Sequence, residues 1–464
     1  MDYNRSYKSL FMGQGIKVPI INGKFIEYVD LDNAATTPPF KKVMDKVNEF
    51  SSLYSNIHRG SGFKSNLSTE IYGEARKIIA GFVGTDLTDN SVIFVKNSTE
   101  AINKLAKLYN LNDNDIVVCS QMEHHSNDLP WRKKAIVKYI NVTDNGEIDM
   151  NHFMNLIESY KGRIKLVSVT GASNVTGYIN PIHEIAKIAH GIGAKILIDA
   201  SQLAPHRKIN IKGMQDSEHI DFIVFTGHKL YAPFGSGVLI GSKEFFNNVD
   251  PDCVGGGTVK IVTENEVYWD ETPEKNEAGT PNVIGAVALA VSIKIIQNIG
   301  FERIQEHEIV LSEYLFDKLR KTDNIEIYSD MNASFDRHLG VISFNINDIN
   351  HSLVAAILSY EYGIGVRSGC FCAHPYVLKL LRVDRNAVER HKENILSNNK
   401  SQVPGLVRLS LGLQNTHEDI DRLIYALKKI SNGERFGNYI IDKKTGTYMP
   451  EGWNSKYRDH FDFF

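Results

Sequence analysis

The feature that most constrains the fold is an alternation of short β-branched runs with helix-patterned stretches between about residues 90 and 240. Strands separated by helical crossovers pair in parallel and carry helices on both faces of the sheet. The chain is therefore predicted to be α/β, with a mostly parallel sheet sandwiched by helices. The runs expected to be strands are 91–95, 115–120, 164–170, 194–200, 221–225 and 237–241.

The pattern changes near residue 300, which predicts a second, smaller α+β domain. A long helix is followed by the strand-like run 338–346 and by a final helix over 416–430. The first residues contain a short hairpin across 18–29. We predict four parts: an N-terminal arm (1–40) that packs on the small domain, a large domain (41–298), the small C-terminal domain (299–433) and a C-terminal extension (434–464).

Composition narrows the class of ligand. A net charge of -3 and a pI near 6.6 give no basic surface for nucleic acid or anionic lipid. The longest uncharged apolar run, 283–293, is too short to span a bilayer, and residues 1–20 lack the apolar core of a signal peptide. Four cysteines in 464 residues are too few for a disulfide framework. We expect a cytoplasmic protein with a small-molecule ligand, and neither a nucleic-acid nor a membrane partner.

Lys229 is the predicted chemical centre. The apolar run 222–225 gives way at once to a lysine that aromatic residues such as Tyr231 and Phe234 surround in the sequence. Burial lowers the pKa of a lysine and frees its amine to attack a carbonyl. An isolated lysine at a strand end more often reaches out to water. The other strand ends favour the catalytic interpretation.

Each neighbouring strand is followed by residues that suit one cofactor. Ser98 and Thr99 begin a predicted helix, where backbone N–H groups attract phosphate, although a plain N-cap explains them equally well. His124 follows the run 115–120 and could lie flat on an aromatic ring. Asp199 closes an apolar strand and needs a cation or a hydrogen-bond donor, and a pyridinium nitrogen would be such a partner. A Schiff-base lysine, an acid, a stacking imidazole and a phosphate cup are what pyridoxal phosphate needs.

The sequence resembles the fold-type I, class V aminotransferase-like enzymes, and most closely the cysteine desulfurases and selenocysteine lyases of the SufS/NifS type. The resemblance spans most of the chain. The motifs that carry it are LDNAATTP (31–38), NIHRGSG (56–62), NSTEAIN (97–103), QMEHHSNDLPW (121–131), ASNVTG (172–177), IDASQ (198–202), TGHKLYAPFGSGVLIG (226–241), GGG (255–257), EAGTPN (277–282), GVRSGCFCAHP (365–375) and RLSLGLQNTHEDIDRL (408–423).

The resemblance implies a seven-stranded large domain, a homodimer with sites at the subunit interface, and pyridoxal 5'-phosphate as the cofactor. Lys229 would carry the cofactor as a Schiff base. The other residues that it implies for cofactor binding are Asp199, Gln202, His124, Ser98, Thr99, Thr226, His228, Asn174 and, reaching the partner's phosphate, Thr280. The residues that it implies for substrate binding are Arg408, Arg367, Asn174, His58 and Arg59.

The loop 365–377 indicates which reaction the cofactor performs. Cys372 occupies the position of the family's nucleophilic cysteine, five residues after Arg367. Lys229, Cys372 and His124 are therefore the expected catalytic residues. The implied reaction converts L-cysteine to L-alanine and leaves sulfur on Cys372 as a persulfide, for transfer to an acceptor protein or thiol. The glycine, serine and histidine around Cys372 are typical of a loop and argue against a buried structural cysteine.

Several alternatives stay open. The chain could be another class V enzyme, such as an aminotransferase, epimerase or selenocysteine lyase, in which Cys372 is not essential. It could instead be an inactive sulfur-carrier or metal-binding interaction protein. Cys370, Cys372 and His374 offer three metal ligands, but their spacing is too tight for a usual zinc loop, so we expect no metal site.

Two features depart from the SufS type. Cys370 and Cys372 form a Cys-Phe-Cys pattern that resembles the aminotransferase-like domain of molybdenum cofactor sulfurases. The interval from Cys372 to Arg408 is also longer, with a charged, asparagine-rich insertion around 382–404 that is predicted to be a solvated surface excursion. Both leave the sulfur acceptor open.

Overall fold

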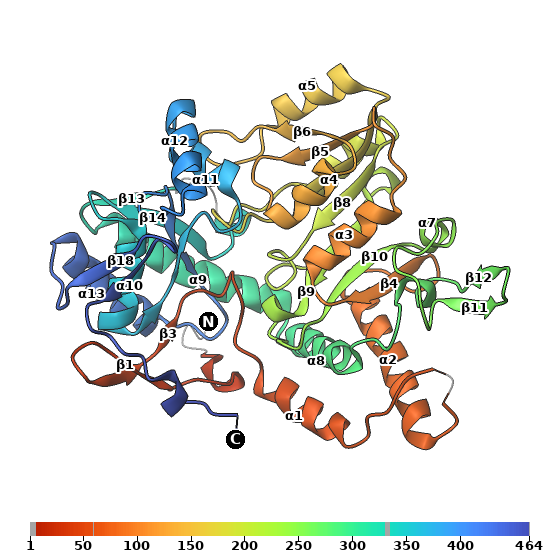
Figure 1. Cartoon of the computed structure of the whole chain (residues 1–464), viewed down its shortest axis with the longest axis horizontal. Helices are drawn as coiled ribbons and strands as arrows, with labels where there is room; N and C mark the ends of the chain where they lie inside the picture. Colours follow the sequence, from red (N-terminus) through yellow and green to blue (C-terminus); the bar gives the residue numbers. More distant parts are fainter. Residues whose placement is uncertain (1–5, 59, 330–334, 464) are drawn as a thin grey trace.

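The computed structural model describes residues 6–58, 60–329 and 335–463, and it contains the predicted sheet between two layers of helices (Figure 1). Within these residues, seven strands pair in the order β4-β10-β9-β8-β7-β5-β6. They are Asn90–Val95 (β4), Ile116–Ser120 (β5), Ile136–Ile140 (β6), Ile164–Thr170 (β7), Lys195–Asp199 (β8), Phe222–Thr226 (β9) and Gly237–Ser242 (β10). Only β10 among them runs antiparallel to its neighbours, so the mostly parallel sheet is confirmed.

Side chains that alternate along each strand pack on opposite layers of helices. In β8, Ile196 and Ile198 belong to one apolar core, while Leu197 belongs to the other. The helices on the first side are Lys41–Ser51 (α1), Phe63–Phe82 (α2), Met150–Tyr160 (α5), Ile182–His190 (α6) and Val283–Ile299 (α8). Those on the other side are Ser98–Leu108 (α3), Leu129–Arg132 (α4) and Lys243–Asn247 (α7).

A second, four-stranded sheet has its own core. Its order is β13-β14-β17-β16, and its strands are Ile325–Ile327 (β13), Val341–Ile346 (β14), Arg367–Gly369 (β16) and Leu406–Ser410 (β17). The helices that contribute to this core are Phe301–Arg320 (α9), His351–Tyr362 (α10) and His417–Ser431 (α13). Residues 365–377, which include Cys372, run from the end of Ile364–Gly365 (β15) through β16 and enter the short helix His374–Leu380 (α11).

The N-terminal segment contacts the second sheet's layer. The predicted hairpin is present as Lys17–Pro19 (β1) paired with Phe25–Glu27 (β2). Val29–Asp30 (β3) then pairs in parallel with Ile364–Gly365 (β15), immediately before the cysteine loop. This pairing delivers the motif 31–38 to the space between the two sheets.

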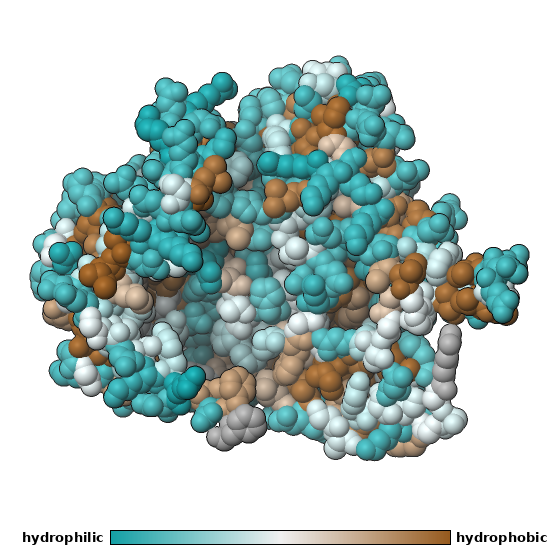
Figure 2. All heavy atoms as spheres, in the orientation of Figure 1, coloured by the Kyte–Doolittle hydropathy of each residue, from teal (hydrophilic) through white to brown (hydrophobic). Residues whose placement is uncertain are grey.

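The insertion and the tail take regular forms that the sequence did not predict. Most of the insertion is a helix, Arg385–Leu396 (α12), with no buried residue, as a solvated surface segment requires. The tail forms a hairpin of Tyr439–Asp442 (β18) and Thr447–Pro450 (β19) against α10. A second hairpin, Val259–Val262 (β11) with Val267–Trp269 (β12), projects from the large lobe with exposed apolar side chains (Figures 1 and 2).

Among the described residues no single helix is long and apolar enough to cross a membrane. The bent pair α8 and α9, which meet at 77°, passes that test of length and composition together. Most of α8 is buried in the core, between α1 and α2.

Candidate active site

Lys229 lies just beyond the carboxyl end of β9, in the short turn Gly227–Lys229 (η4). Figure 2 shows a hollow between the two lobes on this face of the molecule. Burial lowers the pKa of Lys229 to about 8, although Asp199 nearby acts to raise it. The amine is thus largely removed from water and close to a carboxylate, as predicted for a lysine that forms a Schiff base.

Asp199 ends β8, the strand adjacent to β9, and its side chain is buried. Its Oδ1 accepts hydrogen bonds from the Ser201 backbone N–H (3.0 Å) and hydroxyl (2.6 Å). No hydrogen bond to Oδ2 and no ion pair of this carboxylate occurs among the described residues. A buried carboxylate with one unmatched oxygen calls for a cationic or N–H partner.

His124 follows β5 and is held as a neutral ring. Its Nδ1 accepts from the Ser126 backbone N–H (3.2 Å), which leaves the ring proton on Nε2. Burial and the charge of Lys229 lower the pKa of His124 to about 4. A neutral imidazole near Lys229 and Asp199 suits the predicted stacking on a cofactor ring.

The predicted phosphate cup gathers three elements. Asn97 caps α3 by accepting from the Glu100 N–H, so Ser98 and Thr99 are not the cap that the alternative interpretation required. Thr99 Oγ1 lies 2.7 Å from Ser126 Oγ. Thr226 ends β9, and burial and the neighbouring Lys229 lower the pKa of His228 to about 4. Ser98 and Thr99 open an 11-residue helix, and Glu100 in its first turn is turned back to the Lys96 N–H, so the hydroxyls stand at an amino end where a phosphate is favoured.

Asn174 connects three parts of the site. Its side-chain amide donates to the Phe371 carbonyl (2.7 Å) in the cysteine loop. Its own carbonyl accepts from Arg408 (2.9 Å) on β17. Gln202, also buried, donates to the Ala34 carbonyl (2.8 Å). Both side chains therefore fasten loops that come from opposite ends of the chain.

Arg408 and Arg367 share one carboxylate, which sequence reasoning missed. Asp32 accepts from Arg408 Nη2 (2.9 Å) through Oδ1 and lies 2.8 Å from Arg367 Nη2 through Oδ2. Arg408 is buried, its guanidinium lies over the Phe371 ring, and its Nε has no hydrogen-bond partner. Asp32 belongs to the motif 31–38, so the sequence pointed to this segment, but it did not predict that Asp32 pairs with the two arginines.

The two cysteines of the loop have different surroundings. Cys372 is exposed, at φ 54°, and its carbonyl accepts from the His125 N–H (2.8 Å). The Cys372 side chain is near enough to act on the pKa values of Lys229 and Arg408. Cys370 is buried, its Sγ lies 3.2 Å from the Pro404 carbonyl, and burial raises its pKa to about 11. Of the two thiols in this loop, Cys372 is the exposed one.

The alternative metal site in the same loop does not form. Cys370 Sγ turns to the Pro404 carbonyl, while His374 Nδ1 lies 3.1 Å from His125 Nε2 in a stacked pair. Among the described residues, Cys370, Cys372 and His374 do not converge as metal ligands.

Two predicted residues, His58 and Thr280, do not contact this cluster among the described residues. His58 is exposed and belongs to the connection between α1 and α2, which Figure 1 shows at the lower right. Thr280 is exposed in the loop before α8. Arg59 lies outside the described residues. The roles of His58 and Arg59 in substrate binding, and of Thr280 at the partner's phosphate, stay predictions.

A buried acid beneath the site was also missed. Glu123 accepts from Ser120, from Asn127 (2.7 Å) and from the Thr170 N–H (3.0 Å). Burial raises its pKa to about 8. Only its position beside His124 in the sequence could have drawn attention to it.

The arrangement fits pyridoxal phosphate on its own chemistry. A lysine with a lowered pKa, an aspartate with an unmatched oxygen and a neutral imidazole lie near one another, and Ser126 links that imidazole to Thr99 at the amino end of α3. These groups could hold an aldehyde, a pyridinium, an aromatic face and a phosphate, respectively.

Fold and site together define an enzyme of the aminotransferase type. The sequence profile of the class-V aminotransferases matches residues 29–423, and the chain belongs to this family, which confirms the resemblance seen in the motifs. Membership of the family implies pyridoxal phosphate as the cofactor.

Relatives with assigned activities are cysteine desulfurases. The cysteine desulfurase of Haloferax volcanii is 33% identical over 408 residues, 86% of this chain and 88% of that protein. A probable cysteine desulfurase of Staphylococcus epidermidis is 36% identical and covers 88% of this chain and 93% of its own length.

Solved structures agree on the fold. The apo cysteine desulfurase of Thermococcus onnurineus NA1 superposes with a TM-score of 0.75 at 32% identity, over 88% of this chain and 95% of that one. The S-sulfonic acid form of the Escherichia coli cysteine desulfurase CsdA gives 0.76 at 26% identity, over 92% and 98%. The predicted α/β architecture is confirmed.

Proposed function

We propose that this chain is a pyridoxal-phosphate-dependent cysteine desulfurase that converts L-cysteine to L-alanine and retains the sulfur on Cys372 as a persulfide. The observation that carries the proposal is the placement of an exposed thiol within electrostatic reach of Lys229 and Arg408. The desulfurase relatives support it over most of the chain.

The cofactor would be held by residues around the hollow. Lys229 would join it covalently, Asp199 would meet its ring nitrogen, Gln202 its ring oxygen and His124 its ring face. The residues proposed for its phosphate are Ser98, Thr99, Thr226 and His228, with Thr280 from the partner subunit. When bound, pyridoxal phosphate supplies a conjugated sink for the electron pair released at the substrate Cα.

Arg408 is proposed to orient the substrate. Its unpaired, buried Nε is a donor without an acceptor, and a substrate carboxylate would satisfy it. Asp32 holds Arg408 and Arg367 side by side, so that both cations are in place before the substrate arrives. Lys229, as a free amine, would take the proton from Cα at its Nζ.

Cys372 then receives the sulfur. Its Sγ forms a bond to the sulfur of the bound cysteine while the Cβ–S bond of the substrate breaks. Each sulfur is oxidised by one electron, and the carbon gains the electron pair and a proton to become the methyl group of alanine. The exposure of Cys372 leaves the outer sulfur open to an acceptor.

Mass spectrometry of the intact holoenzyme after incubation with L-cysteine tests this proposal. We expect a gain of one sulfur atom on the 365–377 peptide, lost on mild reduction. Cys372→Ser should lose the gain and the alanine production with it. The matched control Cys370→Ser should keep both, because Cys370 is buried against Pro404. Alanine release at the parent rate by Cys372→Ser would favour an idle Cys372.

The assembly is proposed to be a homodimer in the cytoplasm, with an acceptor protein or thiol for the sulfur. The apolar residues exposed on the β11–β12 hairpin, Ile261, Val262, Val267 and Tyr268, support a subunit contact. All four cysteines are free, as expected in a reducing compartment. Light scattering of the holoenzyme would measure the mass of the assembly.

A further inference from the structure

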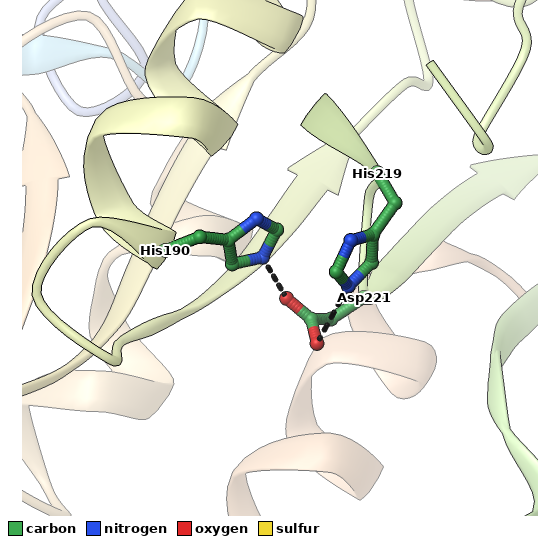
Figure 3. A group of neighbouring side chains, drawn as sticks. All are labelled: His190, His219 and Asp221. Atoms are coloured by element: carbon green, nitrogen blue, oxygen red, sulfur yellow. Dashed lines mark hydrogen bonds and ion pairs between the residues drawn. The ribbon is translucent and has the colours of Figure 1, made fainter. Parts of the chain in front are cut away.

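A second cluster of reactive side chains lies at the amino-terminal end of β9, whereas Lys229 lies beyond the carboxyl-terminal end of that strand. His190 ends α6, His219 follows the turn Asp216–Glu218 (η3), and Asp221 immediately precedes β9 (Figure 3). The ligand atoms of the three side chains all lie within 4.8 Å of one another. Lys229 follows the other end of the same strand, so this cluster is separate from the candidate active site.

Hydrogen bonds fix the orientation of both rings. His190 Nδ1 lies 2.8 Å from the Ser217 carbonyl, and His219 Nδ1 lies 2.6 Å from the Asp216 carbonyl. A carbonyl oxygen only accepts, so each Nδ1 carries a proton. The Nε2 atom of each neutral ring then presents a lone pair, which is the arrangement found in histidines that bind metals.

Both Nε2 atoms point at a carboxylate, which is also an acceptor. His190 Nε2 lies 2.9 Å from Asp221 Oδ2, and His219 Nε2 lies 3.6 Å from Oδ1 (Figure 3). The rings stack with centroids 4.2 Å apart. Without an ion, a proton on His190 Nε2 can bridge to Asp221 Oδ2. Protons on both stacked rings would place two positive charges side by side, whereas one metal cation would serve both rings and the carboxylate.

We propose that His190, His219 and Asp221 bind a divalent first-row transition metal ion, with Zn²⁺ as the reference ion. Two imidazoles and a carboxylate with an open fourth position form a known type of zinc site. Ligand atoms at about 2.0–2.1 Å from a tetrahedral zinc are about 3.3 Å apart. His190 Nε2 lies 2.9 Å from Oδ2 and His219 Nε2 lies 3.6 Å from Oδ1, so each ring is close to that separation from a different carboxylate oxygen.

Lys195 is the competitor for this ion. Its Nζ lies 2.8 Å from Asp221 Oδ1, but its side chain is 43% exposed and can withdraw into water. The Ile196 N–H donates to Oδ2 (2.9 Å) and holds the carboxylate in position without blocking Oδ1. The ion would tie the end of α6 to the β8–β9 connection, which begins with Ser201 and Gln202 of the candidate active site.

Zinc titration of the full-length holoenzyme, first stripped with a chelator, tests the site. Competition with a chromophoric chelator gives the affinity, and metal analysis after gel filtration gives the stoichiometry. We expect His219→Asn and His190→Asn to bind one equivalent fewer than the parent, or to bind the last equivalent at least about a hundredfold more weakly. The exposed His460 provides a control, and His460→Asn should match the parent.

Thermal unfolding supplies a second readout. Zn²⁺ should raise the Tm of the parent and of His460→Asn, but not that of His219→Asn, because only a ligand of the folded state stabilises it. The same zinc stoichiometry and Tm shift in His219→Asn would assign the ion to other residues, such as the exposed Cys253 and Cys372, and overturn the proposal. No zinc bound at about 100 μM would leave only protons at the cluster and would overturn it equally.

Discussion

Two aspartates on neighbouring strands show how the two edges of the sheet differ. Asp221, before β9, is bound by Lys195, His190 and the Ile196 N–H. Burial acts to raise its pKa, but the hydrogen bonds from His190 and Lys195 prevail and lower it to about 2. The carboxylate of Asp199, the last residue of β8, accepts hydrogen bonds only from Ser201 among the described residues. At the amino ends of the strands, the aspartate has partners for its charge. At the carboxyl ends, one oxygen of the aspartate has no partner and can bind a ligand.

We expect the largest effect on activity from Lys229→Ala, which changes only the carboxyl ends of the strands. The carboxyl edge would lose its only amine at the predicted point of attachment, so we expect alanine production to fall by at least about a thousandfold. The visible absorption of protein supplied with the cofactor should change as well. A variant that keeps more than a tenth of the parent rate would remove Lys229 from the mechanism.

The same substitution at the two aspartates gives the next largest effect. Asp199→Asn should slow the reaction by about a hundredfold, because an amide cannot stabilise a protonated ring nitrogen. Asp221→Asn should leave the rate within about twofold and instead lower the stability by about 1–3 kcal/mol, since it weakens the ion pair with Lys195 and the contacts with His190 and the Ile196 N–H. Steady-state kinetics and thermal unfolding of both variants measure the contrast. Equal losses of activity in Asp199→Asn and Asp221→Asn would contradict the separate roles of the two aspartates.

The pH dependence of cofactor attachment sharpens the comparison. Because the pKa of Lys229 is lowered to about 8, its amine is mostly protonated at pH 7 and mostly free at pH 9. The rate of cofactor attachment to the cofactor-free protein should rise roughly tenfold over that interval and level off above it. In Asp199→Asn the midpoint should move to lower pH, because the carboxylate acts to raise the pKa of Lys229. A flat profile would contradict the lowered pKa.

The smallest effect is expected at Ser201. Its hydroxyl donates to Asp199 Oδ1 (2.6 Å) and positions the carboxylate. Ser201→Ala should lower kcat by about fivefold, which corresponds to ~1 kcal/mol, with KM little changed. Ser201→Thr keeps the hydroxyl and should recover part of the rate. An equal drop in both variants would indicate a packing defect.

The sequence predicted the carboxyl edge well because its residues follow strands that the apolar pattern exposes. Each of the six predicted strands lies within one residue of its observed bounds at either end. β6 (Ile136–Ile140) was missed because Lys138 and Tyr139 interrupt its apolar run at the edge of the sheet. The β18–β19 hairpin was missed because it packs on α10 and lacks an alternating pattern of its own.

Contacts between segments far apart in the chain could not be predicted from the sequence. Asp32 meets Arg408 across 376 residues, and His190 meets Asp221 across 31. Neither spacing follows a helical or strand period, so only the folded chain brings these side chains together. The loop pattern around Cys372 did predict its exposure, while the burial of Cys370 depends on Pro404, at the end of the insertion.

The backbone at Phe371 and Cys372 limits how this loop can be altered. Both residues have positive φ, 50° and 54°, a conformation that costs non-glycine residues about 1–3 kcal/mol each. Glycine at 371 would relax the turn but would uncover the guanidinium of Arg408, which the Phe371 ring shields. Attempts to make the loop more heat-resistant would therefore weaken the hold on the sulfur donor. Two constraints therefore limit sequence variation in this loop: the positive φ angles of its main chain and the contact of the Phe371 ring with the buried guanidinium of Arg408.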